Sequence, residues 1–355
     1  MISPGGTIGI LGGGQLGRMI ALAAAALGYR SHIFCPEPDS PAMQVTPSAT
    51  LAAYDNEEAL ARFAAAVDIV TFEFENVPAE TAEFLALRKP VRPGPEALRI
   101  GQDRVREKQF LNSIGAPTTA FREVASASDL MGAVGELGPR SILKTARWGY
   151  DGKGQQAIDA GSDLEAAWKN LGAGAGILEA YVDFAREISV IIARGADAID
   201  ATYVPVENRH VNHILDTSIA PAAIDPALAA RSEGMARDIA ARLDLIGLLA
   251  VEMFVTKSGE LLVNELAPRP HNSGHWTIDA CITSQFEQLV RAICGLPLGS
   301  TERHSDAVMT NLIGGDVVKW RAALDDPNTK LHLYGKTSAP PGRKMGHVTK
   351  LLPRR

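Results

Sequence analysis

The sequence has few of the residues that hold small secreted domains together. Its 355 residues include only three cysteines, Cys35, Cys281 and Cys294, which are widely spaced and form no CxxC pair. This spacing argues against a disulfide framework and a structural zinc site, and it favours a reducing compartment. We therefore expect a cytoplasmic protein whose thiols are core or surface groups.

Long apolar runs and basic runs are also missing. No segment of about 18 residues is free of charges and helix breakers, so the sequence predicts no transmembrane helix. Met1 to Gly6 lack the basic region of a signal peptide and run straight into a strand. The net charge is -6 and the only basic run is Pro353 to Arg355, so nothing indicates a nucleic-acid or membrane surface. We expect small-molecule partners.

What is present is an ordinary globular composition, 46% hydrophobic and 21% charged, with enough length for two or three domains. The chain opens with a short apolar strand, Thr7 to Leu11, a glycine-rich turn, an alanine-rich helix from about Arg18 to Leu27, and a second strand, Ser31 to Phe34. This order predicts a βαβ unit of a parallel, doubly wound α/β sheet.

The glycine-rich turn has two possible interpretations. Gly12, Gly14 and Gly17 match GxGxxG, which occurs in NAD(P)-dependent dehydrogenases. Those enzymes need an acidic residue at the end of the second strand, and the nearest one, Glu37, is offset. Glycines also permit a tight turn and close helix packing without any nucleotide. This segment alone leaves both interpretations open.

Acidic residues follow a later strand of the same predicted sheet. The strand Ile69 to Phe74 carries Glu73 and is followed by Glu75 and Asn76. Ligands bind at the carboxyl ends of strands in α/β sheets, although acids before a helix often serve only as caps. A rigid connector then leads to an expected helix, Gly101 to Leu111, and we place the first domain boundary near residue 100.

A strand and a loop in the next part of the chain have the composition of a phosphate site. Lys144 lies on the strand Ser141 to Thr145, and the loop to Gln155 contains three glycines and Lys153. Such a loop can direct backbone amides at phosphate oxygens. Its spacing is not that of a Walker P-loop. The later segment Ile177 to Val182 is a strand whose backbone can read an adenine.

The strongest chemical signal is a predicted hairpin of two strands, Val251 to Val255 and Leu261 to Glu265. If Thr256 pairs with Leu261, Glu252 faces Glu265, and two facing carboxylates repel unless a proton or a cation lies between them. Mg²⁺ suits such a site. The alternative is a solvated hairpin with both acids in water. The loop that follows favours the metal, because it gathers polar and cationic groups: Asn264, Arg269, His271, Asn272 and His275.

Two further clusters are weaker signals. Glu207, His210 and His213 lie close together, but no HxxxH spacing supports a zinc site there. Three cations, Lys336, Arg343 and Lys344, lie among glycines near the end of the chain, as a clamp for a substrate phosphate or as a solvated basic turn.

Taken together, the motifs resemble those of the N5-carboxyaminoimidazole ribonucleotide synthases, ATP-grasp enzymes of purine biosynthesis, over nearly the whole chain. The matching segments are GGGQLGRM (12–19), EFENVP (73–78), QDR (102–104), KT (144–145), GYDGKGQ (149–155), VNELAPRPHNSGH (263–275), TSQFEQ (283–288), HLYGK and PGRKMGHV. GYDGKGQ together with NELAPRPHNSGH is highly specific, whereas GGGQLG alone is not.

The resemblance implies an ATP-grasp fold with three domains: a Rossmann-like substrate-binding domain (1–100), a lid with the glycine-rich loop (101–184) and a C-terminal mixed-sheet domain (185–355). The implied reaction joins bicarbonate to 5-aminoimidazole ribonucleotide with ATP and Mg²⁺, through carboxyphosphate. The ATP contacts that the resemblance implies are Arg104, Lys144, Gly149, Tyr150, Asp151, Gly152, Lys153, Gly154, Gln155, Glu179, Ala180, Tyr181, Val182, Glu187, His210, Asn264 and Glu265.

The resemblance also implies the remaining roles. Mg²⁺ is held by Glu252 and Glu265, the catalytic residues are Arg269, His271, Asn272 and Lys153, and the ribonucleotide is bound by Gln15, Glu73, Tyr150, Asp151, Lys336 and Arg343. A homodimer is expected, with a contribution from the apolar region 283–298. The sequence departs from the family at His213, where glycine is common. The alternatives are another ATP-grasp ligase, an NAD(P)-dependent dehydrogenase and a non-catalytic nucleotide sensor.

Overall fold

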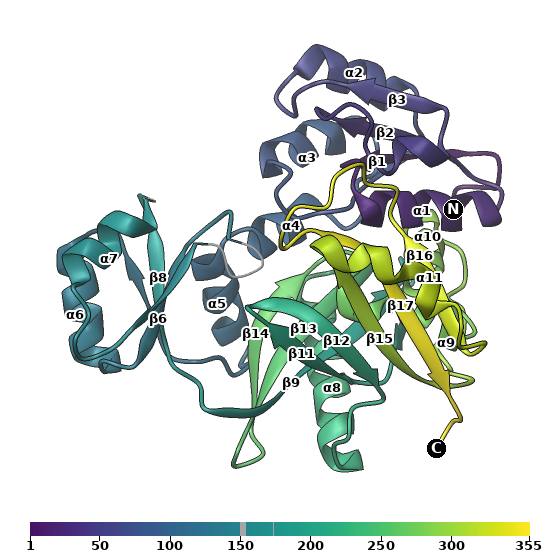
Figure 1. The fold of residues 1–355 in the computed structure, drawn as a ribbon. Helices are drawn as coiled ribbons and strands as arrows, with labels where there is room; N and C mark the ends of the chain where they lie inside the picture. The colour runs from purple at the N-terminus through teal and green to yellow at the C-terminus, as the bar shows by residue number, and fades with distance from the viewer. Residues whose placement is uncertain (150–153, 173) are drawn as a thin grey trace.

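The computed structural model describes residues 1–149, 154–172 and 174–355, which form three β-sheets with helices packed around them (Figure 1). In Figure 1 the N-terminal sheet lies at the top, a second four-stranded sheet projects to the left, and a nine-stranded sheet forms the base. The predicted α/β class is therefore confirmed.

The N-terminal sheet contains the βαβ unit that the sequence predicts. Its elements are β1 (Thr7–Leu11), α1 (Gln15–Ala26), β2 (Arg30–Cys35), η1 (Met43–Val45), β3 (Ser48–Leu51), α2 (Glu57–Ala65), β4 (Ile69–Phe72), α3 (Ala79–Ala86) and α4 (Pro95–Gly101). The strands pair in parallel in the order β3-β2-β1-β4, which is the order of a doubly wound fold. The carboxyl ends of β1 and β4 therefore lie side by side.

Two helices differ from the predicted bounds. Helix α1 begins at Gln15, three residues earlier than expected. The expected helix 101–111 is interrupted, because α4 ends at Gly101 and a new helix begins at Arg104. The Asp103 carboxylate causes this break, since it caps the new helix by accepting hydrogen bonds from two backbone N–H groups of the first turn.

The second sheet is antiparallel and lies in the segment that the sequence predicts as the lid. The elements of this part are α5 (Arg104–Ser113), β5 (Phe121–Val124), α6 (Ala127–Leu137), β6 (Ser141–Thr145), β7 (Gln155–Ile158), α7 (Leu164–Leu171) and β8 (Gly176–Ala180). The strand order is β5-β8-β6-β7, and β6 has the predicted bounds. Helices α6 and α7 cover one face of the sheet, where Leu143 and Leu178 lie in a small core of their own.

The nine-stranded sheet contains the predicted hairpin. The elements of this part are β9 (Phe184–Arg194), β10 (Asp200–Thr202), β11 (Val206–Val211), β12 (Ile214–Ala220), α8 (Pro226–Arg242), β13 (Gly247–Thr256), β14 (Leu261–Ala267), η2 (Asn272–Gly274), α9 (Thr277–Ala280), α10 (Gln285–Cys294), β15 (Asp306–Ile313), η3 (Gly314–Lys319), α11 (Trp320–Ala323), β16 (Thr329–Leu333) and β17 (Lys344–Leu352). The order is β14-β13-β9-β11-β12-β15-β17-β16, with β10 paired to β9. A mixed sheet is expected from the family resemblance, but all pairs of named strands described here are antiparallel.

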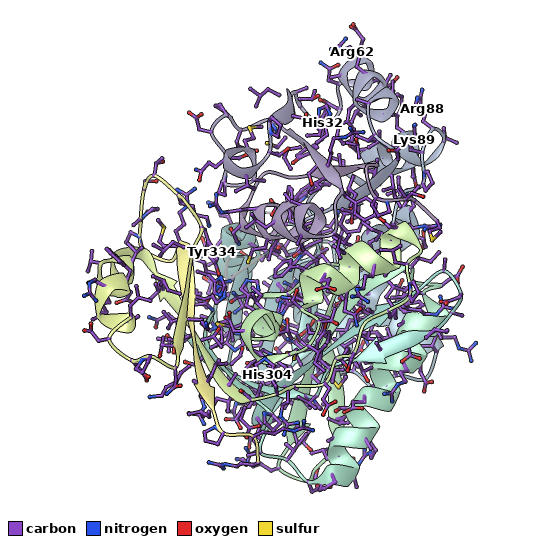
Figure 2. The ribbon with its side chains drawn as sticks, turned by 90° about the vertical axis from the view of Figure 1, so that its right-hand side faces the viewer. His32, Arg62, Arg88, Lys89, His304 and Tyr334 are labelled. Carbon is purple, nitrogen blue, oxygen red and sulfur yellow. The ribbon has the colours of Figure 1, made fainter. Side chains whose placement is uncertain are left out.

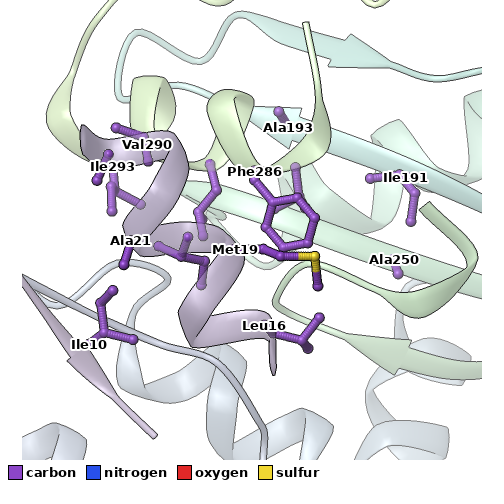
Figure 3. Packing of buried hydrophobic residues seen from close by; sticks show 14 of the residues in the cluster. Ile10, Leu16, Met19, Ala21, Ile191, Ala193, Ala250, Phe286, Val290 and Ile293 are labelled. Carbon is purple, nitrogen blue, oxygen red and sulfur yellow. The ribbon is translucent and has the colours of Figure 1, made fainter. Parts of the chain in front are cut away.

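The main core joins the N-terminal unit to the nine-stranded sheet. Helix α1 packs against α10, and Figure 3 shows Met19 beside Phe286 in this contact. Val290 and Ile293 of α10 are fully buried in the same cluster. The apolar residues of α10 are therefore buried within the monomer core. They are not exposed for the dimer contact expected from region 283–298.

The basic residues of the N-terminal unit and the three cysteines lie in different local environments. Arg62, Arg88 and Lys89 lie at the outer end of the N-terminal domain (Figure 2). The Arg62 guanidinium forms an ion pair with Glu58, one turn away on the same helix. None of the helices in the described ranges is long and apolar enough to cross a membrane. The three cysteines are free and buried, which confirms that they form no disulfide framework.

Candidate active site

All three sheets contribute residues to one cleft of about 730 Å³. The predicted residues that line it are Gln15, Glu73, Arg104, Lys144, Gln155, Glu179, Ala180, Tyr181, Val182, Glu187, His210, Glu252, Asn264, Glu265, Arg269, His271 and Asn272. The structure thus brings together groups that were assigned to three different ligands.

The remaining predicted residues lie elsewhere or are not described. Tyr150, Asp151, Gly152 and Lys153 are outside the described residues. Gly149 and Gly154 do not line the cleft, although the Gly149 carbonyl accepts a hydrogen bond from Arg104 at 3.4 Å.

One cation of the expected phosphate clamp, Lys344, lines the cleft, whereas Lys336 and Arg343 lie outside its lining. The Lys336 ammonium donates to the carbonyl of Lys344 at 2.7 Å. The Arg343 side chain is exposed and donates to the hydroxyl of Ser338 at 2.8 Å. The structure therefore does not bring Arg343 to the other predicted substrate residues.

Two ion pairs line the cleft, one on the second four-stranded sheet and one on the nine-stranded sheet. Lys144 on β6 donates to Glu179 on β8 at 2.6 Å. Burial raises the pKa of Glu179, but the nearby ammonium groups of Lys108 and Lys144 outweigh burial and hold the pKa at about 2. Glu187 on β9 pairs with His210 on β11 and raises the pKa of that imidazole against the effect of burial. Glu179 is thus a fixed, charged hydrogen-bond acceptor, and Glu187 is held in place by His210.

The predicted acid pair is present, but the strand register that produces it differs from the expected register. Glu252 on β13 faces Glu265 on β14. The ladder begins one residue from the expected register, at Val255 and Leu261, and a β-bulge at Asn264 restores the pairing of the two acids. The assumed pairing at the turn was therefore wrong, whereas the facing glutamates are confirmed.

The acid pair has the electrostatics of a cation site. Burial and then the Glu265 charge raise the pKa of Glu252 to about 7. Glu265 accepts a hydrogen bond from the Arg104 guanidinium at 3.1 Å, which offsets only part of the shared negative charge. Two oxygen donors that repel each other in a buried setting are the ligand type that Mg²⁺ takes. The donor set therefore fits a magnesium ion.

A chain of buried hydrogen bonds ends at this acid pair. Ser218 donates to Asn208 at 2.9 Å, and the Asn208 amide donates to Ser189 at 3.0 Å. The Ser189 hydroxyl lies 2.7 Å from that of Ser273, which lies 2.8 Å from Nδ1 of His271. The four residues before His271 are at most 5% exposed. The chain therefore holds the imidazole in place from within the sheet.

The same contacts determine which nitrogen of His271 carries the proton. The backbone N–H of Ser273 donates to Nδ1 at 3.3 Å, so Nδ1 is an acceptor. Nε2 then carries the hydrogen and faces a Glu252 oxygen at 3.2 Å. Burial and then the Arg269 charge lower the pKa of His271 well below its usual value, so the ring is neutral. His271 is thus a fixed neutral donor beside the acid pair.

Arg269 joins the loop after β14 to the N-terminal sheet. Its guanidinium makes a two-pronged contact with Glu75, with one distance of 2.8 Å, and a bond to the Pro270 carbonyl at 3.0 Å. Burial raises the pKa of Glu75, but Arg269 outweighs burial and lowers it to about 2. Among the described residues, this leaves two of the five guanidinium N–H groups available for an anion.

The glycine-rich turn is occupied by a side chain of the protein. The Glu73 carboxylate accepts hydrogen bonds from the backbone N–H groups of Gly14 and Gly17, the latter at 2.7 Å. A β-carbon at Gly12 or Gly14 would collide with this carboxylate. The N-terminus of α1, where a dinucleotide would place its pyrophosphate, therefore holds Glu73. This geometry does not support the dehydrogenase alternative.

His213 shows why glycine is common at its position in the family. It lies in the turn between β11 and β12 with φ of +64°, in the left-handed region that favours glycine. Its Nδ1 lies 3.4 Å from the Gln155 amide at the cleft. Histidine in place of glycine at this position therefore costs backbone strain of about 1 kcal/mol. It also places an imidazole ring at the edge of the site.

Other residues of this region were not among the predicted site residues. Glu75 lines the cleft, and Lys108 lies buried behind it. Glu75 was noted only as part of the acidic run after β4, and Lys108 was not singled out in the sequence. The residues that contact Glu75 and Lys108 are distant in sequence, so residue spacing did not indicate a site there.

Comparisons with known proteins agree with this geometry. Residues 109–286 match the ATP-grasp domain, residues 6–102 the ribonucleotide synthetase preATP-grasp domain, and residues 307–355 the phosphoribosylaminoimidazole carboxylase C-terminal domain. The chain is 51% identical to the N5-carboxyaminoimidazole ribonucleotide synthase of Brucella melitensis biotype 1, over 99% of this chain and 98% of the relative. It is 49% identical to the bifunctional purine synthesis protein purC/E of Dictyostelium discoideum, over 98% of this chain and 37% of that longer protein.

Solved structures give the same relationship. The crystal structure of an N5-carboxyaminoimidazole ribonucleotide synthetase in complex with ADP is 43% identical, with a TM-score of 0.96 over 100% of this chain and 94% of the other. The Aspergillus clavatus synthase in complex with ADP and 5-aminoimidazole ribonucleotide is 31% identical, with a TM-score of 0.93 over 99% and 94%.

The fold and the cleft thus define an ATP-grasp ligase. Within that class, the chain belongs to the N5-carboxyaminoimidazole ribonucleotide synthase family of purine biosynthesis, as the resemblance predicted.

Proposed function

We propose that the cleft carries out the family's reaction, in which ATP and bicarbonate carboxylate 5-aminoimidazole ribonucleotide to the N5-carboxyamino product. The observation that carries this proposal is that three groups of residues meet in one cleft. They are the ion pairs Lys144–Glu179 and His210–Glu187, the facing glutamates, and the Arg269 and His271 donors. Phosphoryl transfer to bicarbonate needs these three functions within reach of one another.

The proposed reaction has two steps. The γ-phosphoryl group of ATP passes to a bicarbonate oxygen, which gives ADP and carboxyphosphate. The exocyclic amine of the ribonucleotide then attacks the carboxyl carbon, the carbon–oxygen bond to phosphate breaks, the amine loses a proton, and phosphate leaves. The protein's part is to position the reactants, to supply fixed donors and to exclude water that would hydrolyse carboxyphosphate.

The nucleotide is proposed to bind on the lid side. Lys144 and Arg104 supply positive charge to the phosphates, and the backbone of 179–182 lies beside the base. Glu187 is an acceptor suited to ribose hydroxyls, because its pairing with His210 fixes the position of its carboxylate. Glu252 and Glu265 would hold Mg²⁺, which when bound neutralises charge on the transferred phosphoryl group.

Bicarbonate is proposed to bind beside the acid pair. Arg269 is anchored by Glu75 and retains N–H groups for an anion, and the neutral ring of His271 adds a donor. Asn272 is held by two hydrogen bonds with Asn311, at 3.0 and 2.6 Å, which fix its amide. Lys153 is the fourth proposed catalytic residue.

The ribonucleotide is proposed to bind between the N-terminal turn and the last part of the chain, at Gln15, Glu73, Tyr150, Asp151 and Lys336. Arg343 is left out of this proposal, because its side chain is exposed and bonded to Ser338. Gln15 and Glu73 line the cleft, and the positive charge of Lys336 acts on Glu73. This side of the cleft lies next to the glycine turn. Because Glu73 already fills that turn, the neighbouring space suits a substrate other than NAD.

Three wider proposals accompany the reaction. The domain division 1–100, 101–184 and 185–355 is kept as a proposal, supported by the three sheets. A homodimer is proposed from the family resemblance, and the molecular mass in solution tests it. A cytoplasmic location is proposed from the three free, buried thiols.

The reaction is tested by following a labelled carboxyl group. Purified protein with ATP, Mg²⁺, [¹⁴C]bicarbonate and 5-aminoimidazole ribonucleotide is expected to form one labelled product per ADP. Omission of the ribonucleotide should abolish the product, and formate in place of bicarbonate should give none, which separates other ATP-grasp ligases. ADP release that is not stimulated by both substrates would refute the assignment, and tight NADH binding would revive the dehydrogenase.

The acid pair predicts that Mg²⁺ stabilises the protein more at higher pH. The native pKa of Glu252, about 7, lies above the ordinary value of 4.5, so metal-free protein loses stability as pH rises from 4.5 to 7. Bound Mg²⁺ requires the carboxylate and removes this loss. The thermal shift caused by Mg²⁺ with ADP should therefore be larger at about pH 8 than at about pH 6, and equal shifts would contradict the prediction.

A further inference from the structure

Strand β14, which carries the proposed magnesium ligand Glu265, is an edge strand of the nine-stranded sheet. One side pairs with β13, and helix α5 packs against it. The bulge at Asn264 displaces the ladder next to Glu265, so the backbone groups there need other partners. The position of Glu265 therefore depends on what holds this edge.

Two adjacent residues of α5 hold it. The Lys108 ammonium donates to the carbonyl of Asn264 at 2.7 Å and to that of Val263 at 3.2 Å. The Glu107 carboxylate accepts the backbone N–H of Leu266 at 2.6 Å. These contacts lie on both sides of Glu265 in the strand. The Val263 N–H donates to the Pro117 carbonyl at 2.7 Å, and beyond this short contact a lysine and a glutamate take the place of a neighbouring strand.

Both side chains are unusually buried for charged groups. Lys108 is 1% exposed and Glu107 is 2% exposed. Burial lowers the pKa of Lys108 and raises that of Glu107 to about 8, so their placement opposes the charged forms. An apolar contact between helix and strand would avoid this cost. The pair is therefore better explained by the position it enforces than by stability.

Lys108 also reaches the lid. Its ammonium lies 3.8 Å from an oxygen of Glu179 on β8, and the other oxygen of that carboxylate accepts from Lys144. One turn before Lys108 on the same helix, Arg104 donates to the Glu265 side chain at 3.1 Å. A single helix face thus connects the nucleotide side of the cleft with the metal side.

We propose that Lys108 is a positioning residue, which sets the bulge that makes Glu265 face Glu252 and ties this geometry to the lid through Glu179. It touches neither substrate nor metal in this assignment. The proposal rests on the proposed function, because it takes Glu252 and Glu265 as the magnesium ligands.

The test is Lys108→Met, which keeps the length of the side chain and removes the ammonium. The Mg²⁺ concentration that supports half-maximal turnover is expected to rise about 10- to 100-fold, the range seen when a group that orients a metal ligand is lost. The KM for the ribonucleotide should stay unchanged. The gain in ADP affinity on adding Mg²⁺, measured by calorimetry without turnover, should fall by a similar factor.

Two variants serve as controls. Lys169→Met removes an exposed lysine of the lid helix α7 and should leave the Mg²⁺ dependence unchanged. Glu107→Gln retains an oxygen that can accept the Leu266 N–H and should have a smaller effect than Lys108→Met. If Lys108→Met does not fold, Lys108→Gln, whose amide can still donate to one carbonyl, gives the same comparison.

The outcomes separate the two proposals. A folded Lys108 variant with the Mg²⁺ dependence of the wild type overturns the positioning role, as does a loss of turnover with no change in Mg²⁺ dependence. Failure of both Lys108 variants to fold also overturns it, since the residue then serves folding. If the wild type binds ADP with the help of Mg²⁺ but forms no carboxylated product, the proposed reaction fails and the calorimetric test still stands.

Discussion

Glu265→Gln is expected to lower Mg²⁺-dependent turnover by about 100-fold or more while the protein remains folded. The substitution removes one of two facing carboxylates and keeps the shape of the side chain, so the hydrogen bond from Arg104 retains an acceptor. A loss of about 3 kcal/mol in transition-state stabilisation corresponds to this factor. ADP release measured over a range of Mg²⁺ concentrations, with circular dichroism as the check on folding, gives the result.

The hairpin supplies a matched control for this prediction. Glu260 is an exposed glutamate in the turn between β13 and β14, and Glu260→Gln removes the same charge from the same hairpin. This variant should behave like the wild type. Metal-free Glu265→Gln should be at least as stable as the wild type, because the repulsion that raises the pKa of Glu252 is relieved. Wild-type turnover at low Mg²⁺ would rule out the metal role.

The elements that the sequence predicted well were those set by local patterns. Strands β1 and β6 have the predicted bounds, because each is a short apolar run next to turn residues. The pairing of Glu252 with Glu265 was also predicted, although the register assumed at the turn was wrong by one residue. The bulge that restores the pairing depends on α5 at the edge of the sheet, and the hairpin sequence carries no sign of it.

The glycine turn shows why a motif alone could not identify its ligand. GxGxxG predicted a tight turn with inward N–H groups, and that geometry is present. The group that fills it, Glu73, comes from β4, 59 residues after Gly14. Only the parallel pairing of β1 with β4 brings the two together. A nucleotide phosphate and a carboxylate from the same chain satisfy such N–H groups equally well.

Buried polar contacts over long sequence separations were the least predictable part of the site. Arg269 and Glu75 are 194 residues apart, and Ser189 and Ser273 are 84 residues apart. Serine and asparagine within strands read as ordinary surface residues, so nothing in the sequence predicted the hydrogen-bond chain that fixes His271. The resemblance identified the residues near the ligands, and the structure adds the residues that hold those in place.

Arg269→Lys is expected to abolish most carboxylation, with a loss of about 100- to 1000-fold, while ADP binding stays near that of the wild type. Lysine keeps the charge opposite Glu75 but has no planar fork, so it cannot make the two-pronged contact and offer N–H groups to an anion together. The side chain is 13% exposed, so little water compensates for the lost donors. Formation of the labelled product, set beside calorimetric ADP binding, separates the two effects.

Arg237→Lys is the matched control for this substitution. Arg237 on α8 is 43% exposed and pairs with Asp200, so the same exchange there should alter neither activity nor ADP binding. If Arg269 acts on bicarbonate, the concentration of bicarbonate needed for half-maximal rate should rise in Arg269→Lys, since the missing donors stabilise that anion and carboxyphosphate. An equal loss of ADP affinity would instead indicate that Arg269 contacts the nucleotide. A bicarbonate dependence like that of the wild type would show that Arg269 does not bind bicarbonate.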